Sequence, residues 1–235
     1  FRSTGVIALG GRDAEWTRNE IRACKDLTDK PFGVNLMLMA PNKDELVDII
    51  IEEKPAFVTL GAGNPVPYIK PLQDAGIKVI PVVPSLKLAK RIEEAGADAI
   101  IIEGMEAGGH IGKLTTMSGL PQIVDAVSIP VIAAGGIGDG RGMAAAFALG
   151  AKAVQMGTRF VLSEECIAHE NYKNAVLKAK DRATVMTGLT TGHPVRIIDN
   201  ALAHKYKSLE FSGGSKEELE ALGAGTLRLA AIDGN

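Results

Sequence analysis

The sequence has few aromatic residues, few cysteines and no strong excess of charge of either sign. Aromatic side chains make up 4% of the 235 residues, and the formal net charge is −2. A near-neutral chain without a run of lysine and arginine is not expected to bind nucleic acid. No apolar run reaches the roughly 18 residues that a membrane-spanning helix needs, and no signal peptide is visible. We therefore expect a cytoplasmic protein that does not enter a membrane.

Several signatures of catalysis by side chains alone are also absent. The two cysteines, Cys24 and Cys166, form no Cys-x-x-Cys motif and are expected to be free thiols. No pair of histidines with a carboxylate has metal-ligand spacing, so we predict no metal site built by these groups. There is no Gly-x-Ser-x-Gly motif for a serine nucleophile. Redox chemistry would have to come from a cofactor.

What the chain does contain is a repeat of apolar runs separated by helical patterns. Continuous apolar runs, rather than alternating ones, are typical of parallel strands buried on both faces. The seven runs are Gly5–Leu9, Phe32–Leu38, Ala56–Leu60, Lys78–Val83, Ala99–Ile102, Val131–Ala134 and Ala153–Met156. Their starts are spaced by about 20 to 33 residues, the length of a strand, a helix and two short turns.

The segments between the runs have helical period and recurrent ends. Asn42 precedes a helix to Glu53, and Glu45 is placed to complete a capping box. Another helix is predicted over Leu86–Glu94, followed by a glycine C-cap. Together these patterns predict an α/β fold, a (β/α)8 TIM barrel of which the chain shows seven of the eight strands. An open doubly wound sheet is the competing architecture, although no Gly-x-Gly-x-x-Gly follows the first run.

After Thr158 the repeat ends. We predict that residues 1–162 form the barrel, that 163–215 form a lid or appendage, and that 216–235 form a helical segment closing the barrel. Within the last two parts we expect a helix at Tyr172–Lys180, a strand at Thr184–Met186 and helical segments at 216–222 and 226–231.

The most informative stretch is the glycine-rich loop Glu103–Lys113, which follows a buried strand. Glycines let a backbone approach a ligand closely, and the histidine at position 110 titrates near physiological pH. A solvated loop without a ligand is the simpler interpretation of this stretch taken alone. Its place after a barrel strand favours a functional site, because barrel sites lie at the carboxyl ends of the strands.

Other strand ends carry matching groups. Glycine turns at Gly135-Gly136 and at Gly157, with the Thr158 hydroxyl, predict a phosphate site, toward which the helix after Gly136 would point its N-terminus. Polar residues Asn35, Thr59, Glu103 and Gln155 end otherwise apolar strands and suit hydrogen bonds to a flat heterocycle. No lysine stands at a strand end, which disfavours a Schiff-base aldolase. His193, between a glycine and a proline, is a second histidine to consider.

These segments resemble the FMN-dependent nitronate monooxygenase superfamily, and within it the enoyl-ACP reductase II family. The resemblance rests on Phe32-Gly33-Val34-Asn35, on Glu103–Lys113 with the following Leu-Thr-Thr-Met, on Pro130–Ile137 and on Val154–Phe160. Nitronate monooxygenases usually carry arginine at the position of Ile111, which favours the reductase. The family's first strand with its Gln-Gly-Gly-Met turn, and a Gly-Ser-x-x-Ala-Gly segment after Gly234, are absent from this chain, and we expect residues to be missing at its ends.

The resemblance implies that FMN is the cofactor, that NADH or NADPH is the co-substrate and that His110 is the catalytic residue. The implied FMN contacts are Asn35, Thr59, Glu103, Gly108, Gly135, Gly136, Gln155, Met156, Gly157 and Thr158. It further implies a homodimer, a monovalent cation and an enoyl substrate carried by acyl carrier protein, for which Arg196, Lys205 and Lys207 could form a basic docking patch. A nitronate monooxygenase and a non-redox phosphate-binding barrel remain the alternatives.

Overall fold

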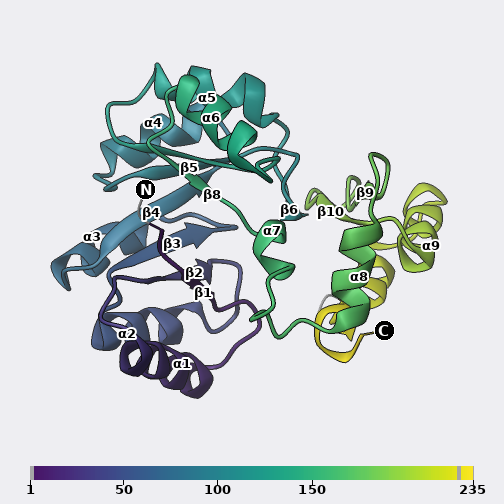
Figure 1. Cartoon of the computed structure of the whole chain (residues 1–235), viewed down its shortest axis with the longest axis horizontal. Coiled ribbons are helices and arrows are strands. Elements are labelled where there is room, and N and C mark those ends of the chain that lie inside the picture. The colour runs from purple at the N-terminus through teal and green to yellow at the C-terminus, as the bar shows by residue number, and fades with distance from the viewer. Residues whose placement is uncertain (1–2, 227–228, 235) are drawn as a thin grey trace.

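The computed structural model describes residues 3–226 and 229–234 and shows an α/β half-barrel beside a smaller appendage (Figure 1). Seven parallel strands pair with their neighbours in chain order, except that β6 belongs to a second sheet and is skipped. They are β1 (Val6–Ala8), β2 (Gly33–Met37), β3 (Phe57–Gly61), β4 (Lys78–Val83), β5 (Ile100–Glu103), β7 (Val131–Ala134) and β8 (Ala153–Gln155). Each coincides with a predicted apolar run, and the curled sheet has the architecture of a (β/α)8 barrel, open between β1 and β8 in the described residues.

Helices cover the outer side of this sheet (Figure 1). They are α1 (Ala14–Leu27), α2 (Lys43–Glu53), α3 (Val66–Asp74), α4 (Leu86–Glu94), α5 (Thr116–Val124) and α6 (Gly140–Ala148). The short α7 (Thr158–Val161) follows β8 and leads toward the appendage (Figure 1). Alternate strand residues such as Leu36, Leu60 and Ile102 join one apolar cluster with helix residues such as Ile50 and Ile92. Burial of each such side chain contributes about 1.5–3 kcal/mol. The residues between them along each strand face the inner side of the sheet.

The appendage follows α7 and lies beside the half-barrel (Figure 1). It contains α8 (Glu170–Lys178), β9 (Thr184–Thr187), β10 (Val195–Ile198), α9 (Ala201–Phe211), α10 (Lys216–Gly223) and a π-helical turn (Leu229–Asp233). α10 contacts α9, and the π-helical turn contacts α8. The division of the chain at residues 162 and 215 stays a prediction. The helical segment predicted at 226–231 extends over residues 227 and 228, which lie outside the described residues.

A second sheet joins the half-barrel to the appendage. β6 (Gly109–His110), in the loop after β5, pairs antiparallel with β10, and β10 pairs antiparallel with β9. The strand predicted at Thr184–Met186 is part of β9, whereas β6 and β10 have no counterpart among the predicted elements. The histidine loop is therefore a strand of a small sheet whose other strands come from the appendage.

One predicted helix cap is wrong. Asn42 does precede α2, but its side chain makes no capping hydrogen bond. Its Nδ2 donates instead to the backbone carbonyl of Arg12 at 3.0 Å. The capping box with Glu45 does not form, because the Asn42 amide donates to a carbonyl in another loop instead.

In the described part of the chain, no helix combines the length and apolar character that crossing a bilayer requires.

Candidate active site

Polar side chains gather where the strands end on the inner face of the sheet. Asn35 is in register with Thr59, and its Nδ2 donates to Thr59 Oγ1 at 2.8 Å. Glu103 is in register with Ala134, which in turn is in register with Gln155. Residues in register on parallel strands point to the same face. The inner face therefore presents the Asn35–Thr59 pair on one side and Glu103 with Gln155 on the other.

Glu103 is the one carboxyl of this group, and it lacks a partner. It is largely buried, and no side chain or backbone group in the described residues forms a hydrogen bond or ion pair with it. Burial raises the pKa of the Glu103 carboxyl from its ordinary 4.5 to about 7. Polar groups taken out of water are nearly always hydrogen-bonded. The Glu103 oxygens remain accessible to water, so this strand end has room for a ligand donor but does not require one.

The glycine turns meet the histidine loop. Gly135 and Gly136 follow β7 with φ of 93° and 73°. A Cβ on Gly135 would lie 2.9 Å from the carbonyl oxygen of Gly104, so no side chain fits between this turn and the loop after β5. A Cβ on Gly108 would lie 3.7 Å from Thr158 Oγ1, so the same loop also lies over the start of α7. The structure therefore brings Gly108, both glycine turns and Thr158 to one end of the sheet.

One part of the predicted phosphate site is wrong. The N-terminus of α6 is already capped by Asp139, whose carboxylate accepts from the backbone N–H groups of Arg141 at 2.9 Å and Gly142 at 3.2 Å. These amides are therefore not available to an anion. The glycine turns and the Thr158 hydroxyl are what remains of the site. Met156 and Gly157 connect β8 to α7 at the same end, with Met156 half-buried and Gly157 exposed.

A network that the sequence did not predict ties the histidine loop to the end of β7. The Glu106 carboxylate accepts from Thr116 N at 3.0 Å, and Thr116 Oγ1 donates to the carbonyl of Gly135 at 2.8 Å. A side chain on Gly104 would collide with Thr116. Glu106 and Thr116 lie within the resemblance motif, but nothing in their spacing indicated that they contact each other.

His110 is exposed on β6 and is held by β10. His110 is in register with Val195, and Ile111 N donates to the carbonyl of Pro194 at 3.0 Å. His193 lies two residues before β10, close enough for its charge to act on His110. Partial desolvation, and then the charge of His193, lower the pKa of the His110 imidazole. The pairing thus brings together two histidines that are distant in sequence, whereas the catalytic role of His110 stays a prediction.

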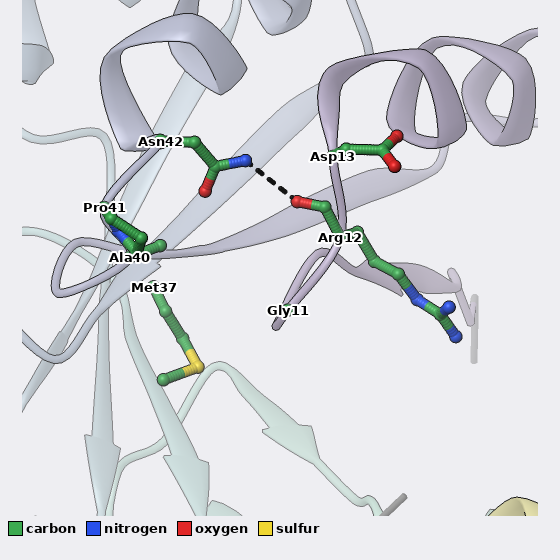
Figure 2. A pocket seen from close by; sticks show the side chains of 7 residues that line it. All are labelled: Gly11, Arg12, Asp13, Met37, Ala40, Pro41 and Asn42. Atoms are coloured by element: carbon green, nitrogen blue, oxygen red, sulfur yellow. Dashed lines mark hydrogen bonds between the residues drawn. The ribbon is translucent and has the colours of Figure 1, made fainter. Parts of the chain in front are cut away.

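A pocket opens beside this end of the sheet, in the loops after β1 and β2 (Figure 2). Its volume is about 380 Å³, and it is lined by Gly11, Arg12, Asp13, Met37, Ala40, Pro41 and Asn42. The hydrogen bond from Asn42 to the Arg12 carbonyl joins the two loops (Figure 2). The Arg12 guanidinium stacks over the Trp16 ring, 4.3 Å from its centroid.

Across residues 3–226 and 229–234, no three histidine, cysteine or acidic side chains are grouped as metal ligands would be.

Comparison with known proteins places this geometry in context. A family model described as nitronate monooxygenase matches residues 39–235. The chain is 36% identical to a probable nitronate monooxygenase of Staphylococcus saprophyticus, over 86% of this chain and 70% of the relative. It is 38% identical to the (3aS,4S,5R,7aS)-5-hydroxy-7a-methyl-1-oxo-octahydro-1H-indene-4-carboxyl-CoA dehydrogenase of Rhodococcus jostii, over 90% of this chain. It spans only 59% of the length of that relative.

Solved structures give the same grouping. FabK from Thermotoga maritima is 51% identical, with a TM-score of 0.95 over 98% of this chain and 73% of that one. A nitroalkane oxidase from Streptomyces ansochromogenes is 29% identical, with a TM-score of 0.79 over 86% of this chain and 71% of that one.

Proposed function

The chain belongs to the nitronate monooxygenase family, a family of oxidoreductases, and on this premise we propose that it is an FMN-dependent enoyl-ACP reductase. In this reaction NADH or NADPH reduces the carbon–carbon double bond of a trans-2-enoyl thioester, as in bacterial type II fatty-acid synthesis. The proposal is carried by one observation: a partnerless carboxyl, a polar pair and two glycine turns surround the end of the sheet beside the His110 loop.

The residues at this end of the sheet fit FMN. The Glu103 carboxyl has no protein partner among the described residues, so it could accept a hydrogen bond from a flavin N–H or a ribityl O–H. Gly135 and Gly136 have no side chains of their own, so their backbone N–H groups could approach a phosphate on the side not covered by Glu106, and Thr158 offers a hydroxyl. The residues that would hold FMN are Asn35, Thr59, Glu103, Gly108, Gly135, Gly136, Gln155, Met156, Gly157 and Thr158. When bound, FMN would supply the hydride transfer that protein side chains cannot perform.

His110 would act on the substrate thioester. Two roles suit an imidazole here: donating a proton to Cα, or donating a hydrogen bond to the thioester oxygen as enolate charge develops. The lowered pKa of His110 favours the neutral imidazole at neutral pH. A neutral imidazole can donate a hydrogen bond to a developing oxyanion, but it is a weak acid and therefore a poor proton donor. We therefore propose that His110 donates a hydrogen bond to the thioester oxygen.

Two comparisons support a thioester substrate. The identity of 51% to FabK, an enoyl-ACP reductase II, is higher than the 36% to the S. saprophyticus and the 41% to the Staphylococcus aureus probable nitronate monooxygenases. The R. jostii relative is named for a carboxyl-CoA substrate, which is also a thioester. Acyl carrier protein is the proposed carrier, with Lys205 and Lys207 on α9 as candidate docking cations. The homodimer and the monovalent cation are proposed from the resemblance alone, and the cytoplasmic location is proposed from the composition of the sequence.

The test uses the full-length, FMN-loaded protein without oxygen. NADH or NADPH is added while flavin absorbance is followed, and then a short trans-2-enoyl-CoA is added. We expect bleaching by one nucleotide and recovery of absorbance on addition of the enoyl thioester. A bound flavin that neither nucleotide bleaches would exclude the reductase. His110→Ala should retain FMN but slow the recovery step, and an unchanged rate would remove His110 from the reaction.

Nitronate monooxygenase activity is the second candidate, because the matching family model and a curated relative both have that name. In this reaction O2 would be the electron acceptor for an alkyl nitronate, and His110 would act as the base that forms the nitronate from a neutral nitroalkane. Oxygen uptake with an alkyl nitronate, without any requirement for a nicotinamide nucleotide, would favour this candidate over the reductase.

A further inference from the structure

The loop that carries His110 is held at both of its ends by one strand of the appendage. At the tip, β10 pairs with β6 through the register of Val195 with His110. At the base, Arg196 Nε donates to the backbone carbonyl of Met105 at 2.9 Å. The backbone N–H of Met105 donates in turn to the carbonyl of Leu114 at 2.8 Å, which closes the loop on itself. Adjacent residues of β10 therefore hold the tip and the base of one closed loop.

Arg196 is anchored and does not touch the histidine side chain. Its Nη1 donates to Thr184 Oγ1 at 3.0 Å, on the neighbouring strand β9, so the guanidinium spans from β9 to Met105. Arg196 is in register with Gly109, and neighbouring strand residues point to opposite faces. Its side chain thus lies on the face opposite to that of His110. Any effect of Arg196 on the imidazole must pass through the backbone of the loop.

We propose that Arg196 is a positioning residue, which fixes the His110 loop over the inner face of the half-barrel by bridging the Met105 carbonyl to Thr184. The functional part of this inference rests on the role proposed for His110. A planar guanidinium with donors in fixed directions suits such a bridge, because it can satisfy two acceptors in one orientation.

The test compares Arg196→Gln with Thr184→Val, which removes the second acceptor without altering the arginine. The exposed Arg182→Gln, just before β9, is the matched control for loss of charge in the same region. The first readout is the NMR signal of the His110 imidazole in histidine-labelled protein, assigned among the four histidines by His110→Asn. The second readout is the split between kcat and KM with a short enoyl-CoA, which needs no carrier protein.

We expect Arg196→Gln to shift or broaden the His110 signal and to lower kcat about 10- to 100-fold, since a misplaced catalytic group costs this much. Thr184→Val should act in the same direction but less, and Arg182→Gln should leave both readouts unchanged. FMN content checks that each variant folds. If Arg196→Gln does not fold, Arg196→Lys replaces it, because lysine keeps the charge but cannot span both acceptors.

Two results would overturn the proposal. One is a His110 signal and a kcat in the arginine variants that match those of the unaltered protein. The other is a defect confined to substrates on acyl carrier protein and seen as a rise in KM, which would indicate docking. The imidazole signal does not depend on which reaction is catalysed. Failure of the reductase assignment would therefore leave the positioning role separately testable.

Discussion

Replacing Glu103 with glutamine should remove a large part of the pH dependence of this protein's stability. Burial raises the pKa of the Glu103 carboxyl from 4.5 to about 7, with no partner to stabilise its charge. The neutral carboxyl therefore favours the fold below pH 4.5, and this contribution is lost as the pH rises through 7. One pKa unit corresponds to about 1.4 kcal/mol, so the buried charge costs at most about 3.5 kcal/mol above pH 8. Glutamine resembles the neutral acid at every pH.

The assay is urea unfolding of FMN-free protein between pH 4.5 and 8.5. The free energy of unfolding of Glu103→Gln, relative to the unaltered protein, should rise by about 2 to 3 kcal/mol across this range. Glu220→Gln, at an exposed position on α10, should show no such rise. Adding FMN should favour the unaltered protein, because ligand donors would pair with the carboxylate. A difference that stays constant with pH would refute the assignment of a neutral, unpartnered Glu103.

Three further predictions concern the site's surroundings and the fold. His193→Gln should raise the pKa of His110, measured by NMR titration, because a nearby like charge disfavours protonation; an unchanged titration would mean that desolvation alone lowers it. Glu210→Gln should cost about 1 to 3 kcal/mol in urea unfolding, because this buried carboxylate accepts from the Gly188–Thr190 turn at 2.8 to 3.3 Å; a loss no larger than that of Glu220→Gln would contradict this. Burial opposes the charge of Glu53, but hydrogen bonds from the cations of α1 lower its pKa overall, so the stability from its charge is present above pH 4.5 and lost below. Glu53→Gln should cost about 2 kcal/mol at pH 7 and less in acid, and a cost independent of pH would argue against the ion pairs.

Much of the half-barrel was predictable because its signals are local. The seven apolar runs all overlap strands, and Gly96 has positive φ just after the helix predicted over Leu86–Glu94. Hydrophobic periodicity, helix caps and turn residues depend on a few neighbouring positions, so they can be recognised in the sequence. The same locality limits them. Asn42 was assigned to a cap from its neighbours, but a carbonyl in another loop recruits its amide.

The polar strand ends could also be chosen from the sequence, since carboxyl ends of parallel strands meet at one edge. The sequence does not show which hydrogen-bond partner each of these polar groups has. Asn35 is paired with Thr59, whereas Glu103 is left without a partner in the described residues. Asp139 occupies the helix N-terminus that seemed available to a phosphate. Each outcome depends on distances between loops that no spacing along the chain encodes.

By itself, the sequence determined the order of strands and helices, the end of the sheet where a site would lie and the histidine loop as its centre. Only the tertiary structure decided that this loop is a strand of the appendage's sheet. β6 has two residues, too few for any periodic pattern, and Arg196 lies 91 residues from the Met105 carbonyl that it binds. A contact of that range is made by the packing of the appendage against the half-barrel, which is a property of the folded chain as a whole.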